Sequence, residues 1–255
     1  MNECRLKEKT IIHSLQFIYI ISVIFEEWNM EITNRSFLES WINFNCDYYP
    51  NVAAVILKEF KNSYDNKLRK YLAVDIFKLV SEEIETIAMW LYTLEKCALD
   101  PNCKIYEVYL KENVKNDKFE KLTMNILKLT SKEFRLKYGI KEDIELKEIK
   151  GQTDNLIQEM IKHIYELVHN GKVDNSNDLL KIYNKSKHGL VIYSDPNTPD
   201  NNLEIIIAKT ESGLMDMPFF EASEELVETM YNSITKICTP ILMSIIRLKY
   251  YSEIN

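Results

Sequence analysis

The stretch from about Asp65 to Leu99 constrains the fold of this chain more than any other part of the sequence. Neither glycine nor proline interrupts it, and apolar residues recur at spacings of three and four, at Leu68, Leu72, Ile76, Leu79, Val80, Ile84, Ile87, Leu91 and Leu94. This spacing places one apolar stripe along a helix, so Ile84 and Ile87 are expected to face the core. Because about 30 helical residues span roughly 45 Å, the stretch predicts the central helix of a bundle.

Shorter periodic segments predict further helices on both sides of this one. They cover about residues 6–28, 36–42, 52–60, 103–113, 118–137, 153–170 and 223–251. Between two of them, Asp47-Tyr48-Tyr49-Pro50 is typical of a turn, and Pro240 is expected to kink the last helix. Only five glycines and six prolines occur in 255 residues, a composition that favours long helices over a many-turned β fold.

One part of the sequence has the pattern of strands. Leu190–Tyr193 and Leu203–Ala208 are rich in β-branched residues, and turn formers occupy Asp195–Asn202 between them. This order predicts a β-hairpin with a long loop over residues 189–209. The predicted fold is therefore mainly α, a multi-helix bundle with one β-hairpin inserted before the C-terminal helix.

The chain is expected to form one domain over residues 1–255, with an N-terminal subdomain (1–63) beside a bundle (64–255) as the alternative. Its net charge of −7 excludes a globally basic nucleic-acid coat but allows a local basic patch. The apolar run Ile11–Phe25 lacks a small-residue cleavage site and is too short to cross a bilayer. We therefore expect a buried helix there, no membrane partner and a cytoplasmic location.

Five cysteines form an odd number without a compact framework. Cys97 and Cys103 flank Asp100-Pro101 at a spacing that matches no common zinc pattern. Reduced thiols are the expectation for a chain of this kind in a cytoplasm.

Metal and cofactor motifs are weak or missing. Glu166-x-x-His169 has the spacing found in di-iron carboxylate bundles, but those sites need two such motifs and the sequence has one. Glu82, Glu83 and Glu85 are expected to form a solvated helix face. No Walker A or Gly-x-Gly-x-x-Gly loop is present, so the sequence predicts neither a metal nor a cofactor.

The candidate functional site lies on the segment 179–189, which has the pattern of a short helix. On such a helix one stripe, at the spacing i, i+3, i+4, i+7, consists of Lys181, Asn184, Lys185 and His188. Two cations, an amide and an imidazole suit a phosphate. The same residues are typical of a solvated helix end, because cations before Gly189 complement the negative end of the helix dipole.

RNA cleavage would give these side chains distinct roles. His188 would move a proton at the 2′-hydroxyl, and Lys181 and Lys185 would neutralise the scissile phosphate. Asn184 faces the same way as His188, so Lys181, Asn184 and His188 are the catalytic candidates. Lys185 is a candidate nucleic-acid contact, together with the neighbouring Lys187 and Tyr183.

Lys181 and His188, with six residues between them, resemble the motif of HEPN domains. These are small helical bundles whose ribonuclease members carry an arginine, usually followed by a polar residue, and a histidine four to six residues later. The resemblance covers about residues 65–188, and the segments Val74–Leu94 and Leu156–His169 suit its long antiparallel helices. It implies a protein of the toxin or phage-defence type that binds or cleaves RNA. It also implies a homodimer, because the family usually pairs two motifs across a dimer.

The chain departs from the family motif at one position. Lys181 stands where an arginine is usual, and lysine lacks the forked guanidinium that grips a phosphate with two hydrogen bonds. A metal-independent endoribonuclease and a non-catalytic relative that binds nucleotide or a partner therefore both remain open. The alternative from another class is a non-enzymatic interaction or regulatory module, which would use the hairpin and the C-terminal helix to hold a protein partner.

Overall fold

The computed structural model describes residues 32–111, 125–169 and 222–254, together with the backbone of short strands between 172 and 221. The chain divides into two compact units, Met1–Thr33 and Asn34–Asn255. The expected helix over residues 6–28, with the apolar run inside it, lies outside the described residues.

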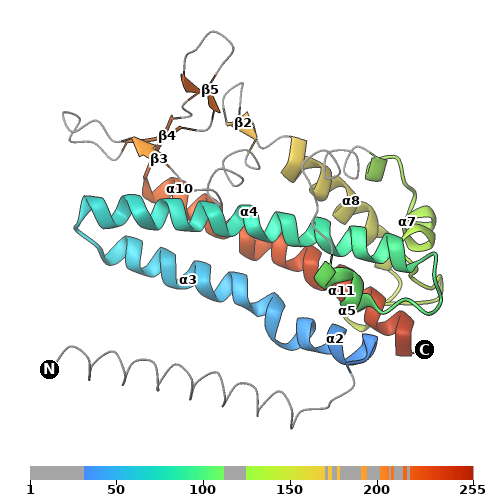
Figure 1. Cartoon of the computed structure of the whole chain (residues 1–255). Coiled ribbons are helices and arrows are strands. Elements are labelled where there is room, and N and C mark those ends of the chain that lie inside the picture. The colour runs from blue at the N-terminus through green and yellow to red at the C-terminus, as the bar shows by residue number, and fades with distance from the viewer. Residues whose placement is uncertain are drawn as a thin grey trace, which may run out of the picture. The chain divides into compact units, whose positions relative to one another are not determined.

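The second unit is mainly helical, which confirms the mainly α part of the predicted fold class (Figure 1). Its helices are α2 (Asn34–Ser40), the π-helical turn η1 (Trp41–Asn45), α3 (Cys46–Asn62), α4 (Asn66–Cys97), α5 (Ile105–Lys111), α7 (Ser131–Lys137), the 3-10 turn η2 (Lys147–Ile149), α8 (Thr153–His169), α10 (Glu224–Ser233), the π-helical turn η3 (Ile234–Cys238) and α11 (Thr239–Ile254).

The central helix forms where the sequence predicts it. α4 begins after Asp65, whose side chain accepts hydrogen bonds from the backbone N–H groups of Lys67 and Leu68, as expected of an N-cap. Ile84 and Ile87 are each 3% exposed, so the predicted core face is confirmed. α3 runs antiparallel beside α4, and α10 and α11 pack against both helices (Figure 1).

The predicted turn at Asp47–Pro50 is wrong, because α3 continues through it with Pro50 inside the helix. The π-helical turn η1 directly precedes α3 and locally widens the helix ahead of the proline. Tyr49 is buried, and its hydroxyl shares a hydrogen bond with Thr86 on α4 at 2.8 Å. Packing of this face against α4 thus outweighs the cost of a proline within a helix.

Two other helix boundaries differ from the predictions. The single helix expected over 118–137 does not form as such, because Thr130 begins α7 with a capping box that pairs its side chain and backbone with Glu133. The last predicted helix is present, but the π-helical turn η3 divides it just before Pro240. A π-helical turn is a common source of a bend, and here it accompanies the proline.

Short strands lie between α8 and α10, and the structure describes their backbone. They are β1 (Lys172–Val173), β2 (Asn177–Asp178), β3 (Val191–Tyr193), β4 (Asn202–Ile206), β5 (Ala208–Lys209), β6 (Met215–Asp216) and β7 (Phe219–Glu221). β4 pairs antiparallel with β3 on one side and with β7 on the other. The loop between β3 and β4 lies outside the described residues, so the hairpin with its long loop stays a prediction.

An aromatic cluster fixes α2 and α5 on the C-terminal half of α4. Trp90 is fully buried, and its ring centroid lies 5.7 Å from that of Phe37, 5.3 Å from that of Trp41 and 5.1 Å from that of Tyr109. Aromatic pairs at such distances add to the stability gained by burial. This cluster anchors α5, which forms one wall of the pocket described below.

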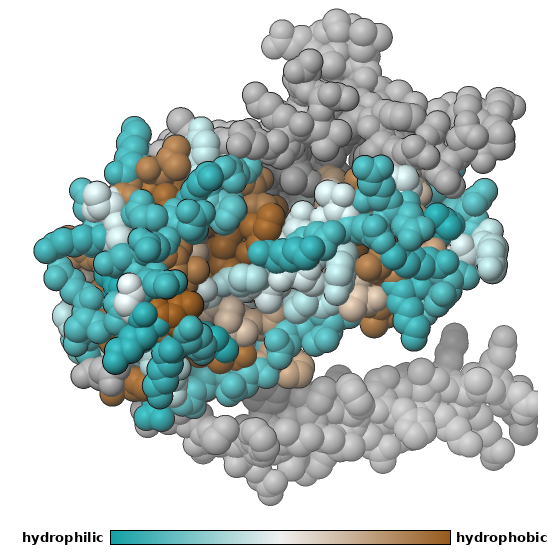
Figure 2. All heavy atoms as spheres, turned by 180° about the vertical axis from the view of Figure 1, so that it is seen from behind, coloured by the Kyte–Doolittle hydropathy of each residue, from teal (hydrophilic) through white to brown (hydrophobic). Residues whose placement is uncertain are grey.

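Hydrophilic residues cover much of the face shown in Figure 2, with apolar residues exposed among them. Within the described part of the chain, no helix is both long enough and apolar enough to cross a membrane.

Candidate functional site

The site predicted from the sequence lies outside the described residues. This applies to the catalytic candidates Lys181, Asn184 and His188 and to the nucleic-acid candidates Tyr183, Lys185 and Lys187. Their placement is therefore not tested, and they remain predictions.

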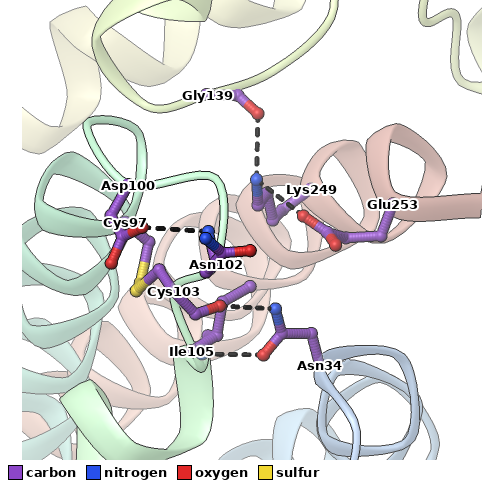
Figure 3. Close-up of a disulfide and its surroundings, with 9 residues drawn as sticks. All are labelled: Asn34, Cys97, Asp100, Asn102, Cys103, Ile105, Gly139, Lys249 and Glu253. Atoms are coloured by element: carbon purple, nitrogen blue, oxygen red, sulfur yellow. Dashed lines mark hydrogen bonds and ion pairs between the residues drawn. A yellow bond between two sulfur atoms is a disulfide. The ribbon is translucent and has the colours of Figure 1, made fainter.

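The described residues form a different chemical feature where α4 ends. Cys97, the last residue of α4, is joined by a disulfide to Cys103, with the two Cα atoms 5.1 Å apart (Figure 3). Between them the backbone N–H of Cys103 donates to the carbonyl of Asp100 at 3.0 Å. This turn brings the two thiols together, so the expectation of reduced thiols is wrong for this pair. Cys46 and Cys238 are free and buried.

Asn34 ties the disulfide turn to α2. Its Nδ2 donates to the carbonyl of Cys103 at 2.8 Å, and its Oδ1 accepts from the backbone N–H of Ile105 at 2.7 Å (Figure 3). The second bond satisfies an N–H in the first turn of α5, which has no partner within its own helix. A residue 69 positions away in the sequence therefore caps α5 and holds the disulfide turn.

The loop after α7 lies close to the same turn. Gly139 has a φ of +61°, and a Cβ built on it would lie 3.3 Å from the backbone of Ala98. Its carbonyl accepts a hydrogen bond at 3.0 Å from Lys249, which also pairs with Glu253 at 2.8 Å (Figure 3). The disulfide turn is thus held by α2 and approached closely by the Gly139 loop.

A surface pocket of about 420 Å³ lies beside the disulfide, and we call it the Lys104 pocket. Its lining residues come from the end of α4, the disulfide turn and α5: Lys96, Asp100, Asn102, Cys103, Lys104, Glu107, Val108 and Lys111. Cys103 is therefore accessible from this pocket. The volume is in the range of small-molecule sites.

Charged side chains dominate the lining of the Lys104 pocket. Lys104 and Lys111 each lie 3.2 Å from a different carboxylate oxygen of Glu107. Hydrogen bonds from Lys104 and then Lys111 lower the pKa of Glu107, so this carboxylate is ionised at neutral pH. Lys96 lies 4.9 Å above the ring of Tyr92. Three ammonium groups face two carboxylates, which leaves an excess of positive charge that favours an anion.

A second pocket of about 350 Å³ is lined by α3 and Tyr231 of α10. Two lysines, Lys58 and Lys61, line it, and the two carboxylates of Glu224 and Glu228, which form ion pairs with Lys61, balance their charge. We therefore regard the Lys104 pocket as the better ligand site among the described residues.

The sequence predicted that Glu83 belongs to a solvated face of its helix. This prediction is wrong, because Glu83 is fully buried. Burial raises its pKa to about 8, although a hydrogen bond from Thr239 lowers it in part. Its Oε2 has no hydrogen-bond partner in the described part of the structure. Among the described residues, no group of three histidines, cysteines or acids is placed to hold a metal ion. The raised pKa of Glu83 favours its protonated form at neutral pH.

No family model, curated protein or solved structure matches the chain.

Sequence reasoning missed the disulfide and the Lys104 pocket, although a signal for both is present. Two cysteines are separated by five residues that include Asp100-Pro101-Asn102, and a lysine adjoins each of them, Lys96 before Cys97 and Lys104 after Cys103. A tight turn between cysteines allows the short Cα separation that a disulfide needs.

Proposed function

We propose that this protein binds RNA through the polar stripe Lys181, Asn184, Lys185 and His188, and that it is a HEPN-like protein of the toxin or phage-defence type acting in the cytoplasm. The observation that carries the proposal is the spacing of these four residues, which gathers two cations, an amide and an imidazole on one helical face. Cations at this spacing suit adjacent phosphates of a nucleic-acid backbone.

The helical architecture supports the proposal. The resemblance to HEPN domains requires long helices packed around one core, and α4 and α8 are of this kind. Ile157, Ile161 and Ile164 of α8 are buried in the same apolar cluster as Ile84 and Leu91 of α4. The candidate stripe follows α8 in the chain, so a bundle core precedes it.

Catalysis is the further step of the proposal. With lysine at the arginine position, His188 would be the general base or acid and Lys181 would stabilise the charge on the phosphate. This chemistry needs no metal. A composite site made of two stripes across a two-fold axis would bring both histidines to one phosphate, which is why we also propose a homodimer.

The test compares His188→Ala with a matched control histidine. His163→Ala is the control, because His163 lies on a described helix, is 41% exposed and pairs with Glu166 at 3.4 Å. Each variant is incubated with labelled single-stranded RNA at low salt. We expect His188→Ala to abolish cleavage and His163→Ala to retain it, with circular dichroism unchanged in both. Binding without cleavage by the wild type would support the non-catalytic relative, and neither binding nor cleavage would reject the proposal.

A protein-interaction module is the second candidate, and an exposed apolar stripe favours it. Leu68 and Tyr71 are spaced by three residues in the first turns of α4, and their exposed fractions are 42% and 49%. Tyr64, which precedes the helix, is fully exposed. The C-terminal helix α11, by contrast, has most of its apolar residues in the core. A partner would therefore contact the start of α4 rather than α11. Loss of partner binding in Leu68→Asp, with RNA binding retained, would separate the two functions.

A further inference from the structure

The disulfide Cys97–Cys103 has two sulfurs in unequal surroundings. Cys97 is 7% exposed and belongs to the apolar core. Cys103 lines the Lys104 pocket and packs only partly against that core. Cys103 is therefore the half of the disulfide that borders the pocket, whereas Cys97 is covered.

The charge of the pocket selects among nucleophiles. A thiolate is negative, and so are the carboxylates that small peptide-like thiols carry. Lys104 and Lys96 adjoin the two cysteines in sequence and line the pocket, and Lys111 extends the positive surface along α5. Positive side chains at the pocket favour the thiolate form of an attacking thiol.

We propose that Cys103 is a thiol–disulfide exchange site for small anionic thiols that bind in the Lys104 pocket. The thiolate attacks Sγ of Cys103 and forms a new sulfur–sulfur bond to it. The bond between Cys103 and Cys97 breaks, and its electron pair leaves on Sγ of Cys97, which takes a proton from water. The product is a mixed disulfide on Cys103 and a free thiol on Cys97, and no oxidant is consumed.

The exchange alters the turn that Asn34 holds. The covalent link across the turn is lost, while the two hydrogen bonds of Asn34 to Cys103 and Ile105 remain available. A bound thiol that carries carboxylates would lie beside Lys104 and Lys111, which pair with Glu107 in the unmodified protein. The modification thus adds negative charge at one defined place on the surface.

The first measurement establishes the disulfide in the full-length protein purified without reductant. Trypsin cuts after Lys96 and Lys104, so both cysteines fall on the single peptide Cys97–Lys104. We expect this peptide to be lighter by two hydrogen atoms than its reduced form. Recovery of the reduced peptide alone would overturn the proposal.

The second measurement uses glutathione as the anionic probe and glutathione diethyl ester, which has the same thiol without carboxylates, as the control. Reactions are stopped with acid and followed by mass spectrometry. We expect glutathione to open the disulfide about threefold faster than the ester, because each exposed ion pair contributes modestly. Fragmentation between Asp100 and Pro101 separates the two cysteines and should place the adduct on Cys103.

Lysine variants test the role of the pocket. Lys104→Gln should remove most of the preference for glutathione over the ester, whereas Lys132→Gln, on α7 and outside the pocket, should keep it. Circular dichroism checks that both variants fold. Equal rates for the two probes, an adduct on Cys97, no reaction, or an unchanged preference in Lys104→Gln would each overturn the proposal.

Discussion

Thr239 donates its hydroxyl hydrogen bond to Oε1 of Glu83 at 2.6 Å, across 156 positions of sequence. Thr239 directly follows the π-helical turn η3, and Glu83 lies in the middle of α4. The thiols of Cys46 and Cys238 lie near the same carboxyl, and burial raises the pKa of Cys46 to about 12 and that of Cys238 well above its usual range. Two thiols and a hydroxyl thus lie near a carboxyl whose raised pKa favours its protonated form at pH 7.

Glu83 should make the stability of the protein depend on pH. Its pKa rises from an ordinary 4.5 to about 8 on folding, so the folded state binds this proton more tightly than the unfolded state. The stability contributed by the protonated form is complete below 4.5 and is lost as the pH rises to about 8. The loss is on the order of 3–5 kcal/mol.

Glu83→Gln keeps an acceptor for Thr239 but removes the titration. In urea unfolding between pH 4.5 and 8, we expect the variant to gain stability relative to the wild type as the pH rises. Glu225→Gln, at an exposed position of α10, should show no such gain. A difference between Glu83→Gln and wild type that is the same at every pH would contradict this assignment.

Ile84→Ala should destabilise the protein by about 2–5 kcal/mol, because it leaves a cavity in a close-packed core. Ile84 is 3% exposed, whereas Leu110 on α5 is 72% exposed, so Leu110→Ala serves as the control. Chemical unfolding of both variants measures the difference. An Ile84→Ala protein as stable as the control variant would show that the α4 core face is misplaced.

A comparison of Gly139→Ala with Gly151→Ala distinguishes the cost of backbone strain from the cost of a steric clash at the new Cβ. Both glycines have positive φ values, +61° and +78°, so each alanine costs on the order of 1–2 kcal/mol from strain alone. Nothing lies within 4 Å of a Cβ built at Gly151, but the backbone of Ala98 lies 3.3 Å from one built at Gly139. Gly139→Ala should therefore lower the thermal midpoint further, and equal losses would argue against the close approach to the disulfide turn.

Sequence periodicity predicted those helices in which regularly spaced apolar residues mark the buried face. α4 was predictable to within two residues at its ends, because one apolar stripe runs along it and Asp65 can cap it. α8 was predictable for the same reason. The helix through Pro50 was not predictable, since a local rule favours a turn there and only the packing of Tyr49 against Thr86 overrides it.

Features that depend on contacts between distant residues were also missed. The sequence pattern suggests that Glu83 is a surface acid in a lysine-rich helix, but Glu83 is buried and accepts a hydrogen bond from Thr239, far away in sequence. The disulfide depends on how the turn after α4 closes. For the candidate RNA site, the pattern of Lys181 and His188 can be read from the sequence, but periodicity cannot distinguish a phosphate site from a solvated helix end.

The proposed homodimer predicts self-association. Sedimentation velocity at tens of micromolar, an order-of-magnitude working range, should show a species of twice the monomer mass. A composite site made of two stripes requires this dimer, so a strictly monomeric protein would contradict the composite site. RNA binding by a single stripe would survive that result.

The salt dependence of RNA binding tests the central claim most directly. Each phosphate contact to a single strand contributes about −0.7 to the slope of log K against log salt. Fluorescence anisotropy with a short single-stranded RNA should therefore give a slope that is shallower by about 0.7 for Lys185→Ala than for the wild type. Lys132→Ala, which breaks the exposed ion pair with Glu142, should leave the slope unchanged. Identical slopes for wild type and Lys185→Ala, or no binding at low salt, would contradict the assignment of the stripe as an RNA site.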